Sequence, residues 1–237
     1  MAEVYDQLMA DAPYSEWVSL TQKIINQYHP DIQSILDLGC GTGEITCRLS
    51  EAGFQLTGVD LSEEMLSLAA QKSPGTKINW LHQDIRELKG LENFDCIVSF
   101  CDVLNYITTE EDLQRVFKNA YHSLTDSGLF IFDVHSLHHI QDHLLGETFA
   151  EVYDDISYIW LCDPGDMNDT VVHDLTFFLQ SEDVYERFDE QHVQRGYSVS
   201  EIERQITSAG FQLLNICSDF KLDGSRDGDR LFFICQK

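Results

Sequence analysis

Basic residues are scarce in this 237-residue sequence, where 15 Lys and Arg stand against 41 Asp and Glu and the formal net charge is −26. Binding to nucleic acid or to an anionic membrane normally relies on clustered Lys and Arg. The basic residues here are scattered, and no three of them are adjacent. We therefore treat nucleic acid as a disfavoured partner, although a local basic groove would be compatible with this composition.

Long apolar segments are also missing, since no stretch approaches the ~18 apolar residues that a membrane span needs. The first eleven residues, MAEVYDQLMAD, contain acids. They lack the basic segment and the following apolar segment of a secretory signal peptide. Hydrophobic residues make up 43% and charged residues 24% of the chain, which is the ordinary globular range. We expect a globular, cytoplasmic protein with no membrane partner.

Metal-binding patterns are weak. The seven cysteines are odd in number and form no C-x-x-C pair, which favours reduced thiols packed as small apolar residues over a zinc site. His138, His139 and His143 resemble a metal cluster but have no companion carboxylate at ligand spacing. We expect these histidines on a surface helix or loop, and we predict that the protein uses no metal.

Strand-like and helix-like segments alternate through the first 135 residues. Strands are expected at 34–38, 54–59, 78–81, 94–100 and 129–134, and helices at 15–28, 44–52, 62–72 and 110–124. This repeat predicts an α/β, Rossmann-like fold with a mostly parallel sheet and helices on both faces. Right-handed crossovers place the strand-to-helix loops on the carboxyl edge of the sheet, where such folds bind ligands.

The first of these loops is rich in glycine. Gly39, Gly41 and Gly43 alternate after the strand at 34–38 and leave the backbone bare where a ligand can lie against it. The dinucleotide pattern G-x-G-x-x-G is broken because Glu44 stands at the third glycine position. A carboxylate at this helix N-terminus would repel a pyrophosphate, so the loop suits a ligand without phosphate.

Two acidic residues follow at the ends of the next strands. Asp60 comes 21 residues after Gly39, a spacing that fits an acid accepting both ribose hydroxyls. Asp84 can accept a hydrogen bond from an exocyclic adenine amine, and Ile85 can offer its backbone N–H to a ring nitrogen. Simpler roles remain open: Asp60 and Asp84 as caps of the following helices, and Asp37 as a structural hydrogen-bonding residue.

The segments DLGCGTG (37–43), GVDLS (58–62), QDI (83–85), FDCIVSFCDVLNYI (94–107) and SGLFIFDV (127–134) together resemble the class I S-adenosylmethionine-dependent methyltransferases. The resemblance covers residues 34–135, and the final helix and strand pair of that fold fits 198–236. It is nearest to small stand-alone bacterial methyltransferases that begin with a Tyr-Asp pair, here Tyr5-Asp6. It implies a seven-stranded sheet, S-adenosylmethionine as cofactor and S-adenosylhomocysteine as product.

The resemblance also implies a set of cofactor-binding residues. They are Tyr14, Trp17, Asp37, Gly39, Cys40, Gly41, Thr42, Gly43, Asp60, Leu61, Met65, Asp84, Ile85, Phe100 and Cys101. In this set the glycine loop cradles the methionine and ribose, and Phe100 and Cys101 lie under the methionyl group. Tyr14 and Trp17 are equally compatible with plain core positions of the first helix.

The pattern changes after residue 135. Residues 147–195 are rich in aromatic and β-branched side chains, which predicts an inserted antiparallel β lid. We expect four parts: 1–33 as an N-terminal helical cap over the cofactor site, 34–140 as the cofactor-binding core, 141–196 as the β-rich insertion on the acceptor side, and 197–237 as the C-terminal part of the core.

Catalytic residues are harder to predict, because the sulfonium donor is already activated and a base is needed only when the acceptor carries a proton. His135 follows the strand at 129–134 on the carboxyl edge, and Asn105 follows the strand at 94–100. These two residues are our catalytic candidates. Other residues suited to acceptor binding are Tyr106, His173, Arg187, His192 and Arg195.

We therefore expect a methyltransferase that acts on N or O of a small-molecule acceptor. Two alternatives stay open: an RNA or protein methyltransferase that docks through a local patch such as Arg187, Arg195 and Arg204, and a non-catalytic cofactor-binding module or dinucleotide oxidoreductase. The acceptor and the oligomeric state are not predicted.

Overall fold

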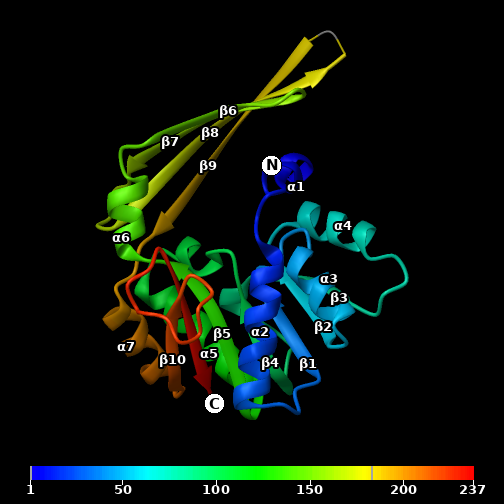
Figure 1. Cartoon of the computed structure of the whole chain (residues 1–237), viewed down its shortest axis with the longest axis vertical. Helices are drawn as coiled ribbons and strands as arrows, with labels where there is room; N and C mark the ends of the chain where they lie inside the picture. Colours follow the sequence, from blue (N-terminus) through cyan, green and yellow to red (C-terminus); the bar gives the residue numbers. More distant parts are fainter. Residues whose placement is uncertain (1, 183) are drawn as a thin grey trace.

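A computed structural model describes residues 2–182 and 184–237. The chain forms a seven-stranded sheet flanked by helices and a four-stranded sheet that stands above one end of it (Figure 1). We refer to the first sheet with its helices as the core, and to the second sheet, strands β6–β9, as the lid. The predicted α/β, Rossmann-like fold with a mostly parallel sheet and an antiparallel β insertion is confirmed.

The core sheet has the strand order β10-β11-β5-β4-β1-β2-β3. Strands β1 to β5 pair in parallel, and β11 is antiparallel to both of its neighbours. The strands are β1 (Ser34–Leu38), β2 (Gln55–Asp60), β3 (Asn79–His82), β4 (Phe94–Ser99), β5 (Leu124–His135), β10 (Gln212–Ser218) and β11 (Arg230–Gln236). Because β1, β2, β3 and β4 run in the same direction, the loops that follow them gather at one edge of the sheet.

Helices cover both faces of the core sheet. They are α2 (Tyr14–Tyr28), α3 (Glu44–Glu51), α4 (Glu63–Lys72), α5 (Glu110–Ser123) and α7 (Val199–Ala209), with the 3₁₀ helices η1 (Ile85–Glu87) and η2 (Val103–Tyr106). Apolar side chains of α2 and α3 pack with one face of the sheet, and those of α5 and α7 pack with the other. Strands buried in this way on both faces read as nearly continuous apolar runs.

Local sequence signals explain where several helices begin and end. Ser198 and Glu201 form a capping box at the start of α7, and Gly210 ends that helix in the left-handed region. Ser62 caps α4 and Thr109 caps α5 through side-chain hydrogen bonds. These caps lie within one or two residues of the expected helix ends.

The lid has the strand order β6-β7-β8-β9, and all its neighbouring strands are antiparallel. The strands are β6 (Thr148–Val152), β7 (Ile156–Pro164), β8 (Thr170–Ser181) and β9 (Val184–Arg195). A short helix α6 (Leu137–His139) and a π-helical turn η3 (Ile140–Leu144) connect β5 to the lid. All four strands fall inside the expected insertion, 141–196.

The expected N-terminal cap, residues 1–33, contains two helices with different positions. Helix α1 (Ala2–Leu8) lies between the lid and α4 in Figure 1, whereas α2 packs along the core sheet. One boundary also differs from expectation, because β5 begins at Leu124, where it already pairs with Phe94, and not at Leu129. Among the described residues, no helix is both long enough and apolar enough to cross a membrane.

Candidate active site

The glycine loop lies at the carboxyl end of β1 and leaves space above its backbone. Gly39, Gly41 and Gly43 all have positive φ, a conformation that favours glycine. A Cβ on Gly41 would meet no atom within 4 Å, whereas a Cβ on Gly39 would lie 2.5 Å from a methyl of Val103. Gly39 is therefore required by internal packing, and Gly41 borders open space that a ligand can fill.

The carboxylate of Asp60 organises this loop. Its Oδ2 accepts a 2.8 Å hydrogen bond from the backbone N–H of Gly41, and its Oδ1 accepts a 2.8 Å bond from the N–H of Ser62. Each carboxylate oxygen has a second lone pair, so both can still accept a hydroxyl. The predicted helix-cap role and the predicted ribose role are therefore compatible at this residue.

Asp37 lies beneath the loop, where it is 4% exposed. It accepts a 2.5 Å hydrogen bond from the hydroxyl of Thr46. Burial raises the pKa of Asp37 to about 7, although the bond from Thr46 acts in the opposite direction. The structure therefore shows the structural hydrogen bond that we considered for Asp37.

Helix α1 is tied to the glycine loop by Asp6. The carboxylate of Asp6 accepts a 2.5 Å bond from the hydroxyl of Thr42 and lies 2.5 Å from the Lys72 ammonium. Burial, with added repulsion from Cys101 and Tyr14, raises the pKa of the neighbouring Tyr5 well above the usual range. Asp6 of the Tyr-Asp pair thus contacts the predicted cofactor site.

The residues predicted to hold the adenine differ in exposure. Leu61 is 63% exposed, Met65 is half-buried, and the side chain of Ile85 packs in the core. Both oxygens of Asp84 accept hydrogen bonds from the guanidinium of Arg86, and these bonds lower the pKa of Asp84. Asp84 also caps η1, so it can accept from an adenine amine only by sharing oxygens that already have partners.

The loop after β4 is held in an uncommon conformation by a buried acid. Cys101 and Asp102 have φ of 60° and 55°, values that few residues other than glycine adopt. The side chain of Asp133, which is 0% exposed, accepts hydrogen bonds from the backbone N–H of Cys101 (3.3 Å) and of Asp102 (2.8 Å). Phe100 packs against Phe232 directly below this loop. Asp133 therefore fixes the segment that is predicted to lie under the methionyl group.

Arg230 links the two acids of this region. Its Nη2 lies 3.0 Å from Oδ1 of Asp102, and its Nη1 lies 3.0 Å from Oδ2 of Asp133. Burial would raise the pKa of Asp102, but His135 and Arg230 beside it hold that pKa well below the usual range. Trp17 donates its indole N–H to Asp133 over 2.6 Å and is 4% exposed, so it supports this cluster from the core.

The two catalytic candidates occupy different environments. Asn105 is 0% exposed, and its amide makes hydrogen bonds with His135 and with the carbonyl of Arg195, so it joins β5, η2 and the end of the lid. Nε2 of His135 lies 3.3 Å from Oδ1 of Asp102, and its ring stacks on His139 with centroids 4.4 Å apart. Asn105 has the contacts of a positioning residue, and a base role for His135 stays a prediction.

A chain of hydrogen bonds connects the lid to Asp102. The indole of Trp160 donates to Nδ1 of His173 over 2.9 Å, and Nε2 of His173 lies 3.2 Å from Oε1 of Gln194. Gln194 then donates to Oδ2 of Asp102 over 2.7 Å. Burial lowers the pKa of His173 to about 4. A neutral His173 accepts a hydrogen bond at Nδ1 and donates one at Nε2. Every hydrogen bond in the series from Trp160 to Asp102 therefore has its donor on the Trp160 side.

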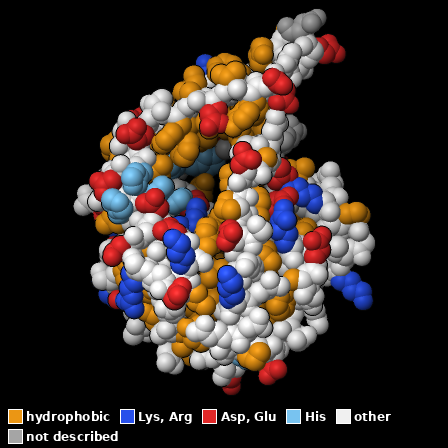
Figure 2. Space-filling view, viewed as in Figure 1, with side chains coloured by type: hydrophobic (Ala, Val, Ile, Leu, Met, Phe, Trp, Pro, Cys, Tyr) orange, Lys and Arg blue, Asp and Glu red, His pale blue; other side chains and the backbone are white. Residues whose placement is uncertain are grey.

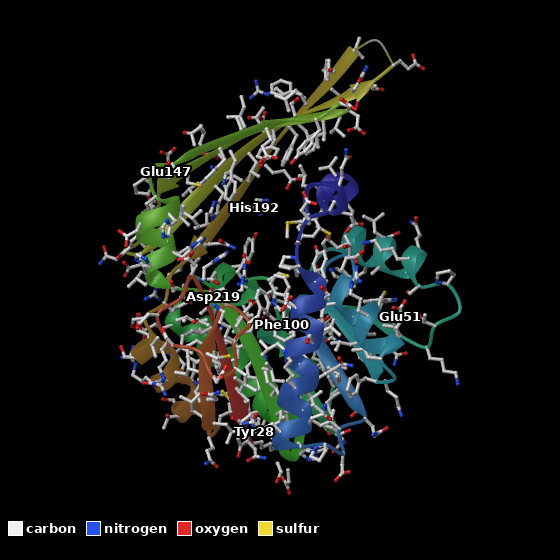
Figure 3. The ribbon with its side chains drawn as sticks, viewed as in Figure 1. Tyr28, Glu51, Phe100, Glu147, His192 and Asp219 are labelled. Atoms are coloured by element: carbon white, nitrogen blue, oxygen red, sulfur yellow. The ribbon has the colours of Figure 1, made fainter. Side chains whose placement is uncertain are left out.

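The lid overhangs the carboxyl edge of the core sheet. Figure 2 shows the molecule hollowed between the two, with hydrophobic and histidine side chains on the underside of the lid. His192 of β9 projects into this cleft above Phe100 in Figure 3. The ring of His192 meets that of Tyr106 edge to face at 5.8 Å, so lid and core side chains meet inside the cleft.

The histidine cluster next to the lid has a carboxylate that we did not expect. Ligand atoms of His138, His143 and Asp229 lie within 4.8 Å of one another, and all three residues are exposed. The expectation that these histidines lack a companion carboxylate is therefore wrong, because the loop before β11 brings Asp229 to them. Exposed groups of this kind are common without a metal, so the absence of a metal from the function stays a prediction.

Comparison with known proteins identifies the family. Residues 35–128 match the model of a methyltransferase domain. All of the chain aligns with 95% of a Bacillus subtilis (strain 168) protein described as "Putative methyltransferase YqeM", at 45% identity. The chain belongs to the S-adenosylmethionine-dependent methyltransferases of class I. A crystal structure of such a methyltransferase from Clostridium acetobutylicum ATCC 824 covers 99% of the chain with a TM-score of 0.91 and 31% identity, and the chain covers 96% of it.

More distant methyltransferases match only part of the chain. A Saccharopolyspora spinosa protein named dTDP-4-amino-2,3,4,6-tetradeoxy-D-glucose N,N-dimethyltransferase is 29% identical over 135 residues, which cover 56% of this chain and 53% of that protein. The membership of this chain rests on the full-length relatives, and its methyltransferase activity and S-adenosylmethionine cofactor follow from them.

Sequence reasoning missed the buried ionic cluster and the lid contacts. Asp133 interrupts the apolar strand LFIFDV, and an acid in a strand buried on both faces signals a buried charge that needs a partner. The partners Arg230 and Gln194 gave no comparable sign, because they lie in segments distant along the chain.

Proposed function

We propose that this methyltransferase transfers the methyl group of S-adenosylmethionine to N or O of a small molecule bound in the cleft between lid and core. The observation that carries the proposal is the position of the lid, which overhangs the core with His192 projecting into the cleft above Phe100 (Figure 3) and meeting Tyr106 of the core edge to face. A cleft between two parts of one chain suits a compact acceptor better than a macromolecular one.

The chain provides suitable groups for the cofactor. Gly41 leaves open space at the loop, Asp60 presents a carboxylate to ribose hydroxyls, and Leu61 offers an exposed apolar side chain to the adenine. When bound, the cofactor supplies a methyl group on a positively charged sulfur. Tyr14 packs in the same apolar cluster as Cys101, where its ring would stabilise a sulfonium by about 0.5–2 kcal/mol through cation–π contact.

The remaining task of the protein is to orient the acceptor and exclude water. Asp133 and Arg230 fix the loop after β4, and the hydrogen-bond chain through Gln194 holds the lid above that loop. The distant relative named as an amino-sugar dimethyltransferase supports a small-molecule acceptor in general terms.

The RNA alternative depends on Arg187, Arg195 and Arg204, and each of these is paired with an acid. Arg187 lies 2.8 Å from Asp189, Arg195 lies 2.9 Å from Glu201, and Arg204 lies 3.5 Å from Glu110. Arginines neutralised in this way contribute little to phosphate binding. These pairs favour the small-molecule acceptor.

The proposal is tested with purified protein, methyl-labelled S-adenosylmethionine and an extract of cells that lack the protein. The extract is separated into metabolite, protein and RNA fractions after the reaction. We expect the label in the metabolite fraction. Label confined to RNA or protein would contradict the proposed acceptor class.

A further inference from the structure

The last lid strand presents alternate residues to the cleft. Side chains two residues apart share one face of a strand, so Glu186, Phe188, Glu190, His192 and Gln194 of β9 lie together. We call this set the inner row. Gln194 bonds to Asp102 of the core, and Phe188 packs in the cluster that contains Val4 of α1. Because both ends of the stretch 188–194 contact the body, Glu190 and His192 between them also face it.

Glu190 and His192 form a partly buried polar pair on the inner row. Nε2 of His192 lies 3.3 Å from Oε2 of Glu190, and both side chains are about one quarter exposed. In the strand register Glu190 is opposite Leu175, which is opposite Trp160. A carboxylate in such surroundings interacts more strongly with a cationic ligand than one in open water.

Among the described residues of the lid, no Lys or Arg side chain faces the cleft to receive a phosphate. Lys and Arg occur twice in strands β6 to β9, as Arg187 and Arg195, which alternate with the inner row and so lie on the opposite face. Their guanidinium groups pair with Asp189 and Glu201.

Among the described residues of the core around the cleft, no Lys or Arg side chain is available to bind a phosphate. Arg230 lies between Asp102 and Asp133, and Lys72 lies between Asp6 and Glu44. A phosphorylated acceptor would therefore meet Glu190 and Glu186 without a compensating positive charge.

We propose that the acceptor is an amine without phosphate groups, bound with its nitrogen between Glu190 and His192 of the lid and Tyr106 of the core. This inference rests on the proposed function and narrows it. It separates the protein from the distant relative whose name specifies a dTDP-linked amino sugar. The edge-to-face contact between Tyr106 and His192 places the polar pair next to η2. Tyr106 is the last residue of η2 and lies four residues beyond Asp102 of the loop after β4.

The chemistry of the pair is that of a base with a charged partner. A primary or secondary ammonium bound beside Glu190 first passes one proton to Nδ1 of His192 and from there to water, since Nε2 faces the Glu190 carboxylate. The lone pair of the resulting neutral amine forms the new C–N bond while the electron pair of the C–S bond returns to sulfur, and the methylated nitrogen leaves as an ammonium. Glu190 stabilises the imidazolium that forms, because the two groups are in contact.

The experiment divides the metabolite extract by charge before the reaction. Portions retained by a cation exchanger, retained by an anion exchanger, and retained by neither are each incubated with the protein and methyl-labelled S-adenosylmethionine. We expect labelled product from the cation-exchanger portion. Label from the anion-exchanger or neutral portion would overturn the amine proposal and leave methyl transfer to a small molecule in place. Label confined to added RNA or protein would overturn the proposed function as well.

Two variants test the assigned residues with the active portion. Glu190→Gln should raise KM for the acceptor about tenfold or more, because a charge-assisted contact is lost. His192→Asn should lower kcat about a hundredfold or more, because the base of the transfer step is lost. Asp189→Asn, one residue away on the outer face, is the control with the same charge change. Equal KM values for Glu190→Gln and the control would overturn the assignment, provided that all variants bind S-adenosylhomocysteine equally.

Discussion

The side-chain amide of Gln194, on the last strand of the lid, donates a 2.7 Å hydrogen bond to Oδ2 of Asp102 at the end of the core sheet. Asp102 also contacts Arg230, so this bond joins the lid to the buried ionic cluster that fixes the loop after β4. Gln194 of the lid and Arg230 of the core therefore share the carboxylate of Asp102.

Removing this connection should loosen the lid. In Gln194→Ala, His173 and Asp102 both lose a hydrogen-bond partner, at a cost of about 1–3 kcal/mol. We expect amide hydrogen exchange in β8 to become at least several-fold faster while S-adenosylhomocysteine affinity changes little. Gln191→Ala is the control, because Gln191 bonds to Asp174 on the outer face. Equal exchange rates in the two variants would show that Gln194 does not hold the lid.

Asp60 should determine cofactor affinity. Asp60→Asn keeps the size of the side chain but removes the charge that accepts from ribose hydroxyls, and such bonds contribute about 1.5–3 kcal/mol. We expect S-adenosylhomocysteine to bind about ten- to a hundredfold more weakly by calorimetry, with an unchanged circular dichroism spectrum. Glu63→Gln on α4 is the control, because Glu63 is exposed and pairs with His82. Unchanged affinity in Asp60→Asn would refute the site assignment.

Arg230 should be important for stability. Arg230→Met leaves Asp102 and Asp133 buried without their cation, and breaking a buried ion pair in this way costs about 3–5 kcal/mol. Urea unfolding should show this loss, and adding Asp133→Asn should recover part of it. Arg226→Met, which removes an exposed pair with Glu203, should change the free energy of unfolding by less than about 1 kcal/mol. Similar losses in both variants would contradict the buried cluster.

His173 should make stability depend on pH. Burial lowers its pKa to about 4 in the folded protein, compared with 6.5 for a free histidine. As pH falls from about 6.5 to 4 the unfolded chain binds the proton first, so the free energy of unfolding decreases, by up to about 3 kcal/mol. His173→Gln should flatten this dependence in urea unfolding. His122→Gln, an exposed residue of α5, should retain it. A slope unchanged in His173→Gln would assign the pH dependence to other groups.

The core elements were predicted within a few residues because their signals are local. Strand β1 matches its expected bounds, and the caps of α4 and α7 mark where those helices begin. The glycine loop and Asp60 were also recognisable, because their spacing is short and their order along the chain follows the order of the strands. Parallel strands bring these positions to one edge whatever the details of packing.

Roles that depend on distant partners were not predictable in the same way. Asn105 was expected at the chemistry, but its amide is saturated by His135 and Arg195, which lies 90 residues away in sequence. The adenine role of Asp84 stays a prediction, because Arg86, only two residues away, already donates to its oxygens. A polar residue at the end of a strand can bind a ligand or can be held by other side chains. Only its contacts in the folded protein distinguish these two roles.

Local sequence patterns are sufficient to predict the methyltransferase fold and the edge where its cofactor is expected, because strand and helix periods and glycine spacing are properties of neighbouring residues. Tertiary structure alone decided which face of β9 is directed to the cleft and which acids meet Arg230. Those features depend on the register of antiparallel strands and on contacts between residues as far apart as Asp102 and Arg230, separated by 128 positions. A shift of one residue in the lid would have directed Asp189 or Gln191, and not Glu190, toward the cleft.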